Sequence, residues 1–238
     1  CKRDPSILKP GLMAGRSFIC LSRMDRMNES SIAMWLDAAL AGFDHGILGA
    51  LHGFAQATGG RLTGIFEAIS LAGEKGAALF LLGLVLFAFR KTRKTGACVL
   101  GAVVLGAVAT NFILKDLVGR ARPFMNSASA QYRDWWAFVG SPAEDGFSFP
   151  SGHATAAMAA MTVLFVKGNK KTSWLWFGAA LLMGISRCYL MVHYPSDVLG
   201  GLLAGALGAW LSIVLVERFY PAFRPLLSRI PGIGTDKA

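Results

Sequence analysis

The sequence predicts an all-α protein: a polytopic membrane helix bundle of about five to six transmembrane helices with an N-terminal amphipathic helix. Three observations lead to this fold class. Hydrophobic residues make up 54% of the 238 residues and charged residues only 16%, whereas soluble domains carry about a quarter charged residues. The apolar residues form runs of membrane-spanning length. Most lysines and arginines lie in short clusters between those runs.

One membrane domain is expected over residues 31–217, between two short flanking segments. Residues 1–30 are polar and basic and lack the apolar core of a signal peptide. Because the chain begins with Cys1, this segment need not include the native start. Residues 218–238 form a basic tail. Within the domain, residues 31–57 are apolar but interrupted by acidic residues and histidines, which predicts an amphipathic helix whose depth in the membrane stays open.

Five further apolar stretches are predicted to form the membrane helices. They are residues 62–89, 96–114, 151–166, 173–191 and 198–216. The first is broken by a polar Gly-Glu-Lys triplet at 73–75, which predicts a kink. In the last, Gly201 and Gly205 are four residues apart, a spacing that lets two helices approach closely.

The charges predict the topology of a multi-pass protein of the cell inner membrane. Basic clusters at 90–94 and 167–171 and the basic tail are expected in the cytoplasm by the positive-inside rule. The polar stretch 115–149 and the turn 192–197 then share the extracytoplasmic face, where they can build one site. This placement also accounts for the net charge of +10, so nucleic acid is not an expected partner.

The turn before the last helix carries the most informative polar residues. Arg187, His193 and Asp197 lie between two apolar runs, and ionisable groups at such a place mark a functional site. Pro195 is expected to start the following helix. A carboxylate bonded to one ring nitrogen of a histidine fixes its tautomer and leaves the other nitrogen free to attack. The alternative is an interfacial ion pair with a satisfied histidine.

Two further polar clusters are expected on the same face. Lys115 and Arg122 are seven residues apart, about two helical turns, and suit an anion with several oxygens; the alternative is a pair of snorkelling interfacial charges. Ser151, Gly152 and His153 follow a proline at the start of an apolar run. There the free N–H groups of a helix N-terminus form an anion site, with His153 beside it as a proton donor. The alternative is a capped helix with an interfacial histidine.

No cofactor or metal is expected from the sequence. It contains neither a carboxylate cluster suited to Mg²⁺ nor a His/Cys set suited to zinc. The four cysteines include no C-x-x-C pair, and Cys98 and Cys188 are expected to pack as small residues.

Taken together, the three clusters resemble the motifs of the type 2 phosphatidic acid phosphatase and haloperoxidase superfamily, in its membrane lipid phosphatase branch. They match in residue type, spacing and order: Lys115-x6-Arg122-Pro123, Pro150-Ser151-Gly152-His153 and Ser186-Arg187-x5-His193-x3-Asp197. The resemblance covers about residues 35–216, and in size the chain is most similar to bacterial undecaprenyl diphosphate phosphatases.

The resemblance implies a role for each motif residue. His193 resembles the nucleophile that forms a phosphohistidine, Asp197 the carboxylate that orients it, and His153 the general acid. The implied reaction is metal-independent. The residues that resemble the phosphate cradle are Lys115, Arg122, Ser151, Gly152 and Arg187.

The implied function is hydrolysis of a lipid phosphate or diphosphate. The expected substrates are undecaprenyl diphosphate, phosphatidylglycerophosphate and phosphatidic acid. The motifs bind the phosphate and not the lipid tail, so they do not distinguish among the three. The implied partners are this substrate and the membrane lipids, whereas the oligomeric state is not predicted. Two alternatives remain: a vanadate haloperoxidase, although such enzymes are expected to be soluble and larger, and a non-catalytic lipid-handling or transport protein.

Overall fold

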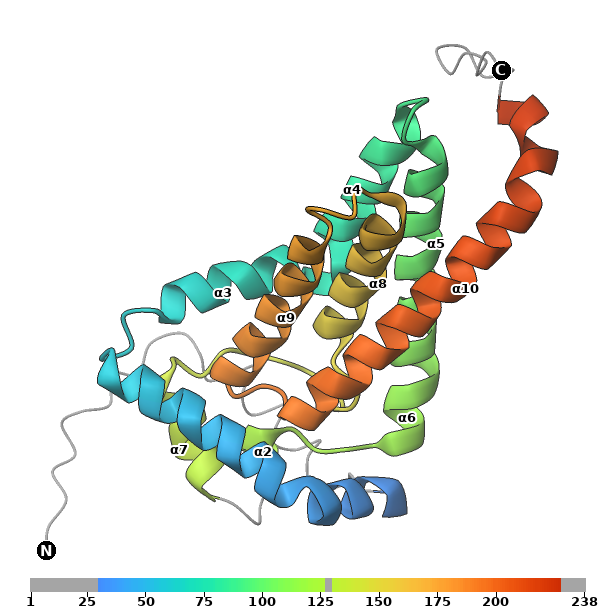
Figure 1. Ribbon diagram of the computed structural model, residues 1–238. Coiled ribbons are helices and arrows are strands. Elements are labelled where there is room, and N and C mark those ends of the chain that lie inside the picture. The colour runs from blue at the N-terminus through green and yellow to red at the C-terminus, as the bar shows by residue number, and fades with distance from the viewer. Residues whose placement is uncertain (1–29, 127–129, 228–238) are drawn as a thin grey trace, which may run out of the picture.

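The computed structural model describes residues 30–126 and 130–227, and the regular structure in these ranges is helical (Figure 1). In chain order the elements are α2 (Ser31–Ala57), α3 (Thr63–Ala72), η1 (Glu74–Gly76), α4 (Ala77–Ala88), α5 (Arg93–Val108), η2 (Ala109–Leu114), α6 (Lys115–Val118), η3 (Pro123–Met125), α7 (Ala130–Phe138), α8 (Gly152–Lys167), α9 (Trp174–Tyr189) and α10 (Pro195–Leu227). The all-α prediction is confirmed, and each predicted apolar stretch forms a helix or a kinked pair of helices.

Within the part of the chain that the structure describes, length and composition make three continuous stretches suitable for crossing a membrane. They are Thr63–Ala88, Arg93–Met125 and Pro195–Phe223. The helices α8 and α9, with 16 residues each, pack beside them in the bundle. The predicted kink at 73–75 is present, because α3 ends at Ala72 and α4 begins only after Gly76, whose φ of 69° is left-handed.

The helix α8 lies at the centre of the bundle and packs against α5, α9 and α10. Glycines make the contact with α10 close: a Cβ atom at Gly201 would lie 2.5 Å from the carbonyl oxygen of Ser151, and one at Gly205 2.4 Å from that of Thr155. The small-residue spacing therefore works as predicted. It brings the N-terminal ends of α8 and α10 together, so that the polar residues at the two helix starts become neighbours.

The amphipathic helix α2 lies across one end of the bundle (Figure 1). Its outer side carries exposed apolar residues such as Trp35 and Phe54, whereas Leu36, Asp44 and Leu48 are buried against the protein. The predicted loop 115–149 also contains a helix, α7, next to α2. Its Trp135 is buried and stacks on His52 of α2. Tryptophans in a polar loop beside a membrane are expected at headgroup level, but Trp135 instead packs inside the protein.

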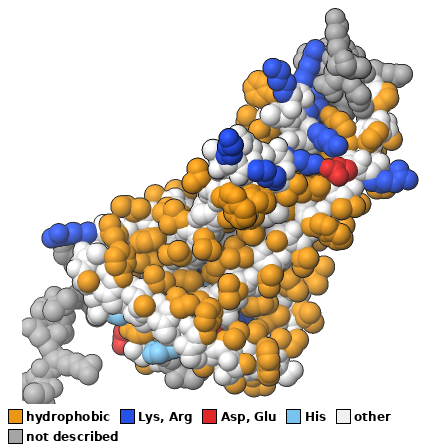
Figure 2. Space-filling model, in the orientation of Figure 1, with side chains coloured by type: hydrophobic (Ala, Val, Ile, Leu, Met, Phe, Trp, Pro, Cys, Tyr) orange, Lys and Arg blue, Asp and Glu red, His pale blue; other side chains and the backbone are white. Residues whose placement is uncertain are grey.

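The two ends of the bundle differ in charge. Lysine and arginine side chains gather at the end where α4 meets α5 and α8 meets α9, and the side of the bundle shown is mostly apolar (Figure 2). The turn between α9 and α10 and the start of α8 lie at the other end. The helix α10 continues to Leu227, so the first part of the predicted tail, residues 218–227, is helical. The remaining flanking residues, 1–29 and 228–238, lie outside the described ranges.

Candidate active site

His193 lies in the tight turn that connects α9 to α10 and is completely enclosed by protein. Met191, with a left-handed φ of 57°, contributes to the reversal of the chain. The guanidinium of Arg122 packs against this turn, since its Nη1 lies 2.9 Å from the carbonyl oxygen of Val192 and 3.3 Å from Nε2 of His193. Burial, together with the charges of Arg122 and Arg187, lowers the pKa of His193 well below 6.5. The imidazole is therefore neutral at physiological pH.

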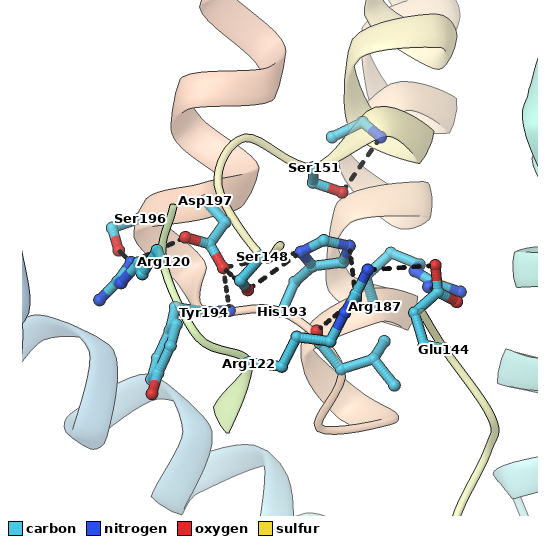
Figure 3. A network of polar contacts seen from close by, with 12 residues as sticks. Arg120, Arg122, Glu144, Ser148, Ser151, Arg187, His193, Tyr194, Ser196 and Asp197 are labelled. Carbon is cyan, nitrogen blue, oxygen red and sulfur yellow. Dashed lines mark hydrogen bonds and ion pairs between the residues drawn. The ribbon is translucent and has the colours of Figure 1, made fainter. Parts of the chain in front are cut away.

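Asp197 lies in the first turn of α10, which begins at Pro195 as predicted. Its Oδ2 is 3.6 Å from Nδ1 of His193, which is longer than a hydrogen bond. The carboxylate instead accepts hydrogen bonds from Ser148 Oγ, from the Tyr194 backbone N–H and from Arg120 Nη1 (Figure 3). The predicted pair is thus brought together, but the imidazole and the carboxylate do not bond directly.

Arg120 is a major part of this site that the sequence motifs did not include. Its guanidinium is 1% exposed and forms ion pairs with Asp197, at 2.7 Å, and with Asp37 and Asp44 of α2, at 2.7 and 2.9 Å. It also lies over the ring of Tyr194. The sequence did contain an indication that α2 has a buried cationic partner: Asp37 and Asp44 are seven residues apart and therefore share one face of this helix.

Arg187, near the end of α9, faces the same space as Arg122 (Figure 3). Both guanidinium groups are buried and both pair with Glu144, from the loop before α8, which was not among the predicted site residues. Burial alone raises the pKa of Glu144, but the charges of Arg187 and Arg122 outweigh burial and lower this pKa to about 2. The carboxylate is therefore ionised and occupies the space between the two cations.

The start of α8 brings in the second motif. Ser151 is the N-cap, as predicted, and its Oγ accepts a hydrogen bond from the Ala154 N–H. Its own N–H donates to the carbonyl oxygen of Asp197 at 3.0 Å, which joins the starts of α8 and α10. His153 is buried, with its Nε2 3.7 Å from Oε2 of Glu74 and without a hydrogen-bond partner among the described residues. Gly152 is the first residue of α8, where free backbone N–H groups can bind an anion. A Cβ atom at this position would lie 3.7 Å from Oδ1 of Asn111, which is an ordinary contact.

Lys115 is the outermost of the predicted cations. It is partly buried at the start of α6, and its charge interacts with those of Arg122 and Arg187. The predicted spacing of two helical turns between Lys115 and Arg122 is wrong, because α6 ends at Val118 and Gly119 adopts a left-handed conformation. The chain then continues extended to Arg122, which carries this residue to the turn before α10.

Among residues 30–126 and 130–227, no group of three or more His, Cys, Asp or Glu side chains is arranged to hold a metal ion. Cys98 and Cys188 are buried and unpaired, and they pack in the apolar core as expected.

Comparison with known proteins identifies the family. Residues 96–221, which contain all three motifs, match the PAP2 superfamily. The chain belongs to the PAP2 superfamily. An undecaprenyl-diphosphatase of Sulfolobus acidocaldarius is 30% identical over 159 residues, which are 66% of this chain and 70% of that protein. Phosphatidylglycerophosphatase B of Bacillus subtilis is 34% identical over 152 residues, 56% of this chain and 66% of that protein.

The PAP2 fold is also seen in a solved structure. The crystal structure of a transmembrane PAP2-type phosphatidylglycerolphosphate phosphatase from Bacillus subtilis superposes with a TM-score of 0.56 at 25% identity, covering 86% of this chain and 96% of that one. These findings confirm the predicted superfamily, the membrane helix bundle and the assignment to PAP2 phosphatases. The protein is thus an integral membrane PAP2 phosphatase with several spans.

Proposed function

We propose that this PAP2 phosphatase removes the terminal phosphate of a membrane lipid through a phosphohistidine at His193, without a metal ion. The observation that carries the proposal is the placement of a neutral, buried His193 with its Nε2 beside Arg122 and in reach of the anion space between Arg122 and Arg187. A neutral imidazole nitrogen is a nucleophile, and fixed cations stabilise the charge that develops on a transferring phosphoryl group.

Each motif residue has a place in the proposed mechanism. The Nε2 lone pair of His193 forms a bond to phosphorus while the bond from phosphorus to the leaving oxygen breaks. His153 donates a proton to that oxygen. Burial, followed by the charge of Arg187, lowers the pKa of His153 to about 4, so the anionic phosphate of the substrate has to offset these effects before His153 carries that proton. Water then cleaves the phosphohistidine and releases orthophosphate. Lys115, Arg122, Arg187, Ser151 and the Gly152 N–H are the proposed phosphate-binding groups.

The proposed substrate is undecaprenyl diphosphate, with phosphatidylglycerophosphate as the second candidate. The relative from Sulfolobus acidocaldarius supports the first, since it is named an undecaprenyl-diphosphatase. The Bacillus subtilis relatives in sequence and structure support the second. We assign the phosphatase domain to residues 31–217, with the site on the extracytoplasmic face. This orientation is supported by the gathering of basic side chains at the opposite end of the bundle (Figure 2).

Phosphate release from the detergent-purified protein tests this proposal. The assay uses undecaprenyl diphosphate, phosphatidylglycerophosphate and phosphatidic acid at equal mole fractions, with and without EDTA, and ranks them by kcat/KM. We expect EDTA to leave the rates unchanged and His193→Gln to abolish them. His45→Gln, a change of an exposed histidine on α2, is the matched control. Turnover by His193→Gln at the wild-type rate would contradict the mechanism. Absence of phosphate release from every lipid would favour a lipid-handling protein.

A further inference from the structure

The hydrogen bonds around His193 determine which ring nitrogen carries its proton. Nε2 lies 3.3 Å from Nη1 of Arg122. A guanidinium has only donors, so Nε2 must accept with its lone pair. Because the ring is neutral, the proton is then on Nδ1. This tautomer leaves the Nε2 lone pair on the side of the anion space.

The Nδ1 side of the ring faces Ser148, which directly precedes the Phe-Pro-Ser-Gly-His motif. Ser148 Oγ is 3.5 Å from Nδ1 and donates a hydrogen bond to Oδ2 of Asp197, while the carboxylate itself is 3.6 Å from Nδ1 (Figure 3). Both Ser148 and Asp197 are 0% exposed. A hydroxyl that donates its hydrogen to a carboxylate keeps lone pairs with which it can accept a hydrogen bond from an N–H. Ser148 therefore acts as donor to Asp197 and as acceptor toward Nδ1 of His193.

Asp197 is held by fixed donors on its other sides. Its Oδ1 accepts from Nη1 of Arg120 at 2.7 Å, and its Oδ2 accepts from the N–H of Tyr194 at 2.8 Å. Arg120 is in turn held by Asp37 and Asp44 of α2. The carboxylate therefore has little freedom to turn toward the imidazole. The hydroxyl of Ser148, at 3.5 Å from Nδ1, lies no farther from the ring and can turn a lone pair toward Nδ1.

We propose that Ser148 is a positioning residue: its hydroxyl links Asp197 to Nδ1 of His193 and so holds the imidazole in the tautomer whose Nε2 is unprotonated. The lone pair of Nε2 can then attack once substrate takes over the hydrogen bond from Arg122. This inference rests on the proposed role of His193 as the nucleophile. The competing explanation is that Ser148 only satisfies a buried carboxylate. In that case its loss lowers stability but leaves the tautomer of His193 unchanged.

The test combines kinetics with nitrogen-15 NMR of the full-length protein labelled at histidine. The chain has only four histidines, and the His193 signals are assigned by their loss in His193→Gln. In the wild type we expect one neutral species with the proton on Nδ1. In Ser148→Ala we expect a mixture of the two neutral tautomers. We expect kcat to fall about 10- to 100-fold, the range found when groups that orient a metal-ligating histidine are removed, with KM changed less than about threefold.

Ser212→Ala is the matched control, because Ser212 is also buried and bonded, to the carbonyl oxygen of Cys98, far from His193 in the bundle. It should leave kcat and the His193 signals unchanged. Either of two results would overturn the proposal: a wild-type His193 that carries its proton on Nε2, or a Ser148→Ala variant that keeps the single Nδ1-protonated species. The measurement of the wild-type tautomer can be made even if the Ser148→Ala variant does not fold. If no lipid phosphate is hydrolysed, the proposed function fails, yet the NMR measurement still decides the role of Ser148.

Discussion

An anion that binds between Arg122 and Arg187 has to displace Glu144. The carboxylate of Glu144 pairs with both guanidinium groups, and its side chain is 22% exposed, so it has a path back to water. The change Glu144→Gln keeps the size of the side chain and removes its charge. We therefore expect this variant to bind orthophosphate more tightly than the wild type.

The expected size of the effect follows from the pKa of Glu144. Burial raises this pKa, but the charges of Arg187 and Arg122 lower it overall from 4.5 to about 2. One pKa unit corresponds to about 1.4 kcal/mol. The surroundings, burial included, therefore favour the ionised carboxylate over the uncharged group by about 3.5 kcal/mol. Since the amide of glutamine retains part of the hydrogen bonding, the dissociation constant for orthophosphate should fall about 10- to 100-fold.

Isothermal titration calorimetry of orthophosphate into the detergent-purified protein measures this constant without a substrate. Asp145→Asn is the matched control: the residue is the exposed neighbour of Glu144 and carries the same charge. Its dissociation constant should change less than about threefold, as expected for an exposed charge in water. Equal or weaker phosphate binding by Glu144→Gln would refute the reasoning, because it would mean that the carboxylate does not compete for the cations in solution.

Three further predictions follow from the packing and the charges. Arg120→Met leaves buried carboxylates without their cation and should destabilise the protein by about 3–5 kcal/mol, seen as a lower midpoint of thermal unfolding. The control Arg133→Met changes an exposed arginine and should leave the midpoint unchanged. Equal midpoints for both variants would refute the role of the ion-pair network. Gly205→Ala places a Cβ atom 2.4 Å from the carbonyl oxygen of Thr155 and should lower the midpoint of thermal unfolding. The control Gly178→Ala, with open space around the new methyl group, should not lower it. A wild-type midpoint for Gly205→Ala would contradict the close helix contact. Burial first, and then the neighbouring arginines, lower the pKa of His193. Its nitrogen-15 signals should therefore stay those of a neutral ring as the pH falls from about 8 through about 6.5, where a histidine in an unfolded chain takes up a proton. A titration midpoint of His193 near pH 6.5 in the folded protein would contradict this expectation.

The positions of the helices could be read from the sequence because they depend on local properties. Runs of apolar residues, the break at 73–75, the cap at Ser151 and the proline at the start of α10 each act over a few residues. The same holds for the close approach at Gly205. The motif residues could be predicted because three short patterns, each with its own spacing, occur in the right order.

The connections between the motifs could not be read in this way, because they depend on the path of the chain in space. Arg120 meets Asp44 across 76 positions of sequence, and Ser148 meets Asp197 across 49. Glu144 enters the anion space from a loop that has no periodic pattern. Such pairs form because burial excludes water from each charge and polar group, so each must find a partner that the folded chain brings within reach. Residue order therefore determines which groups are available, whereas the packing of α2, α8 and α10 determines which of them meet.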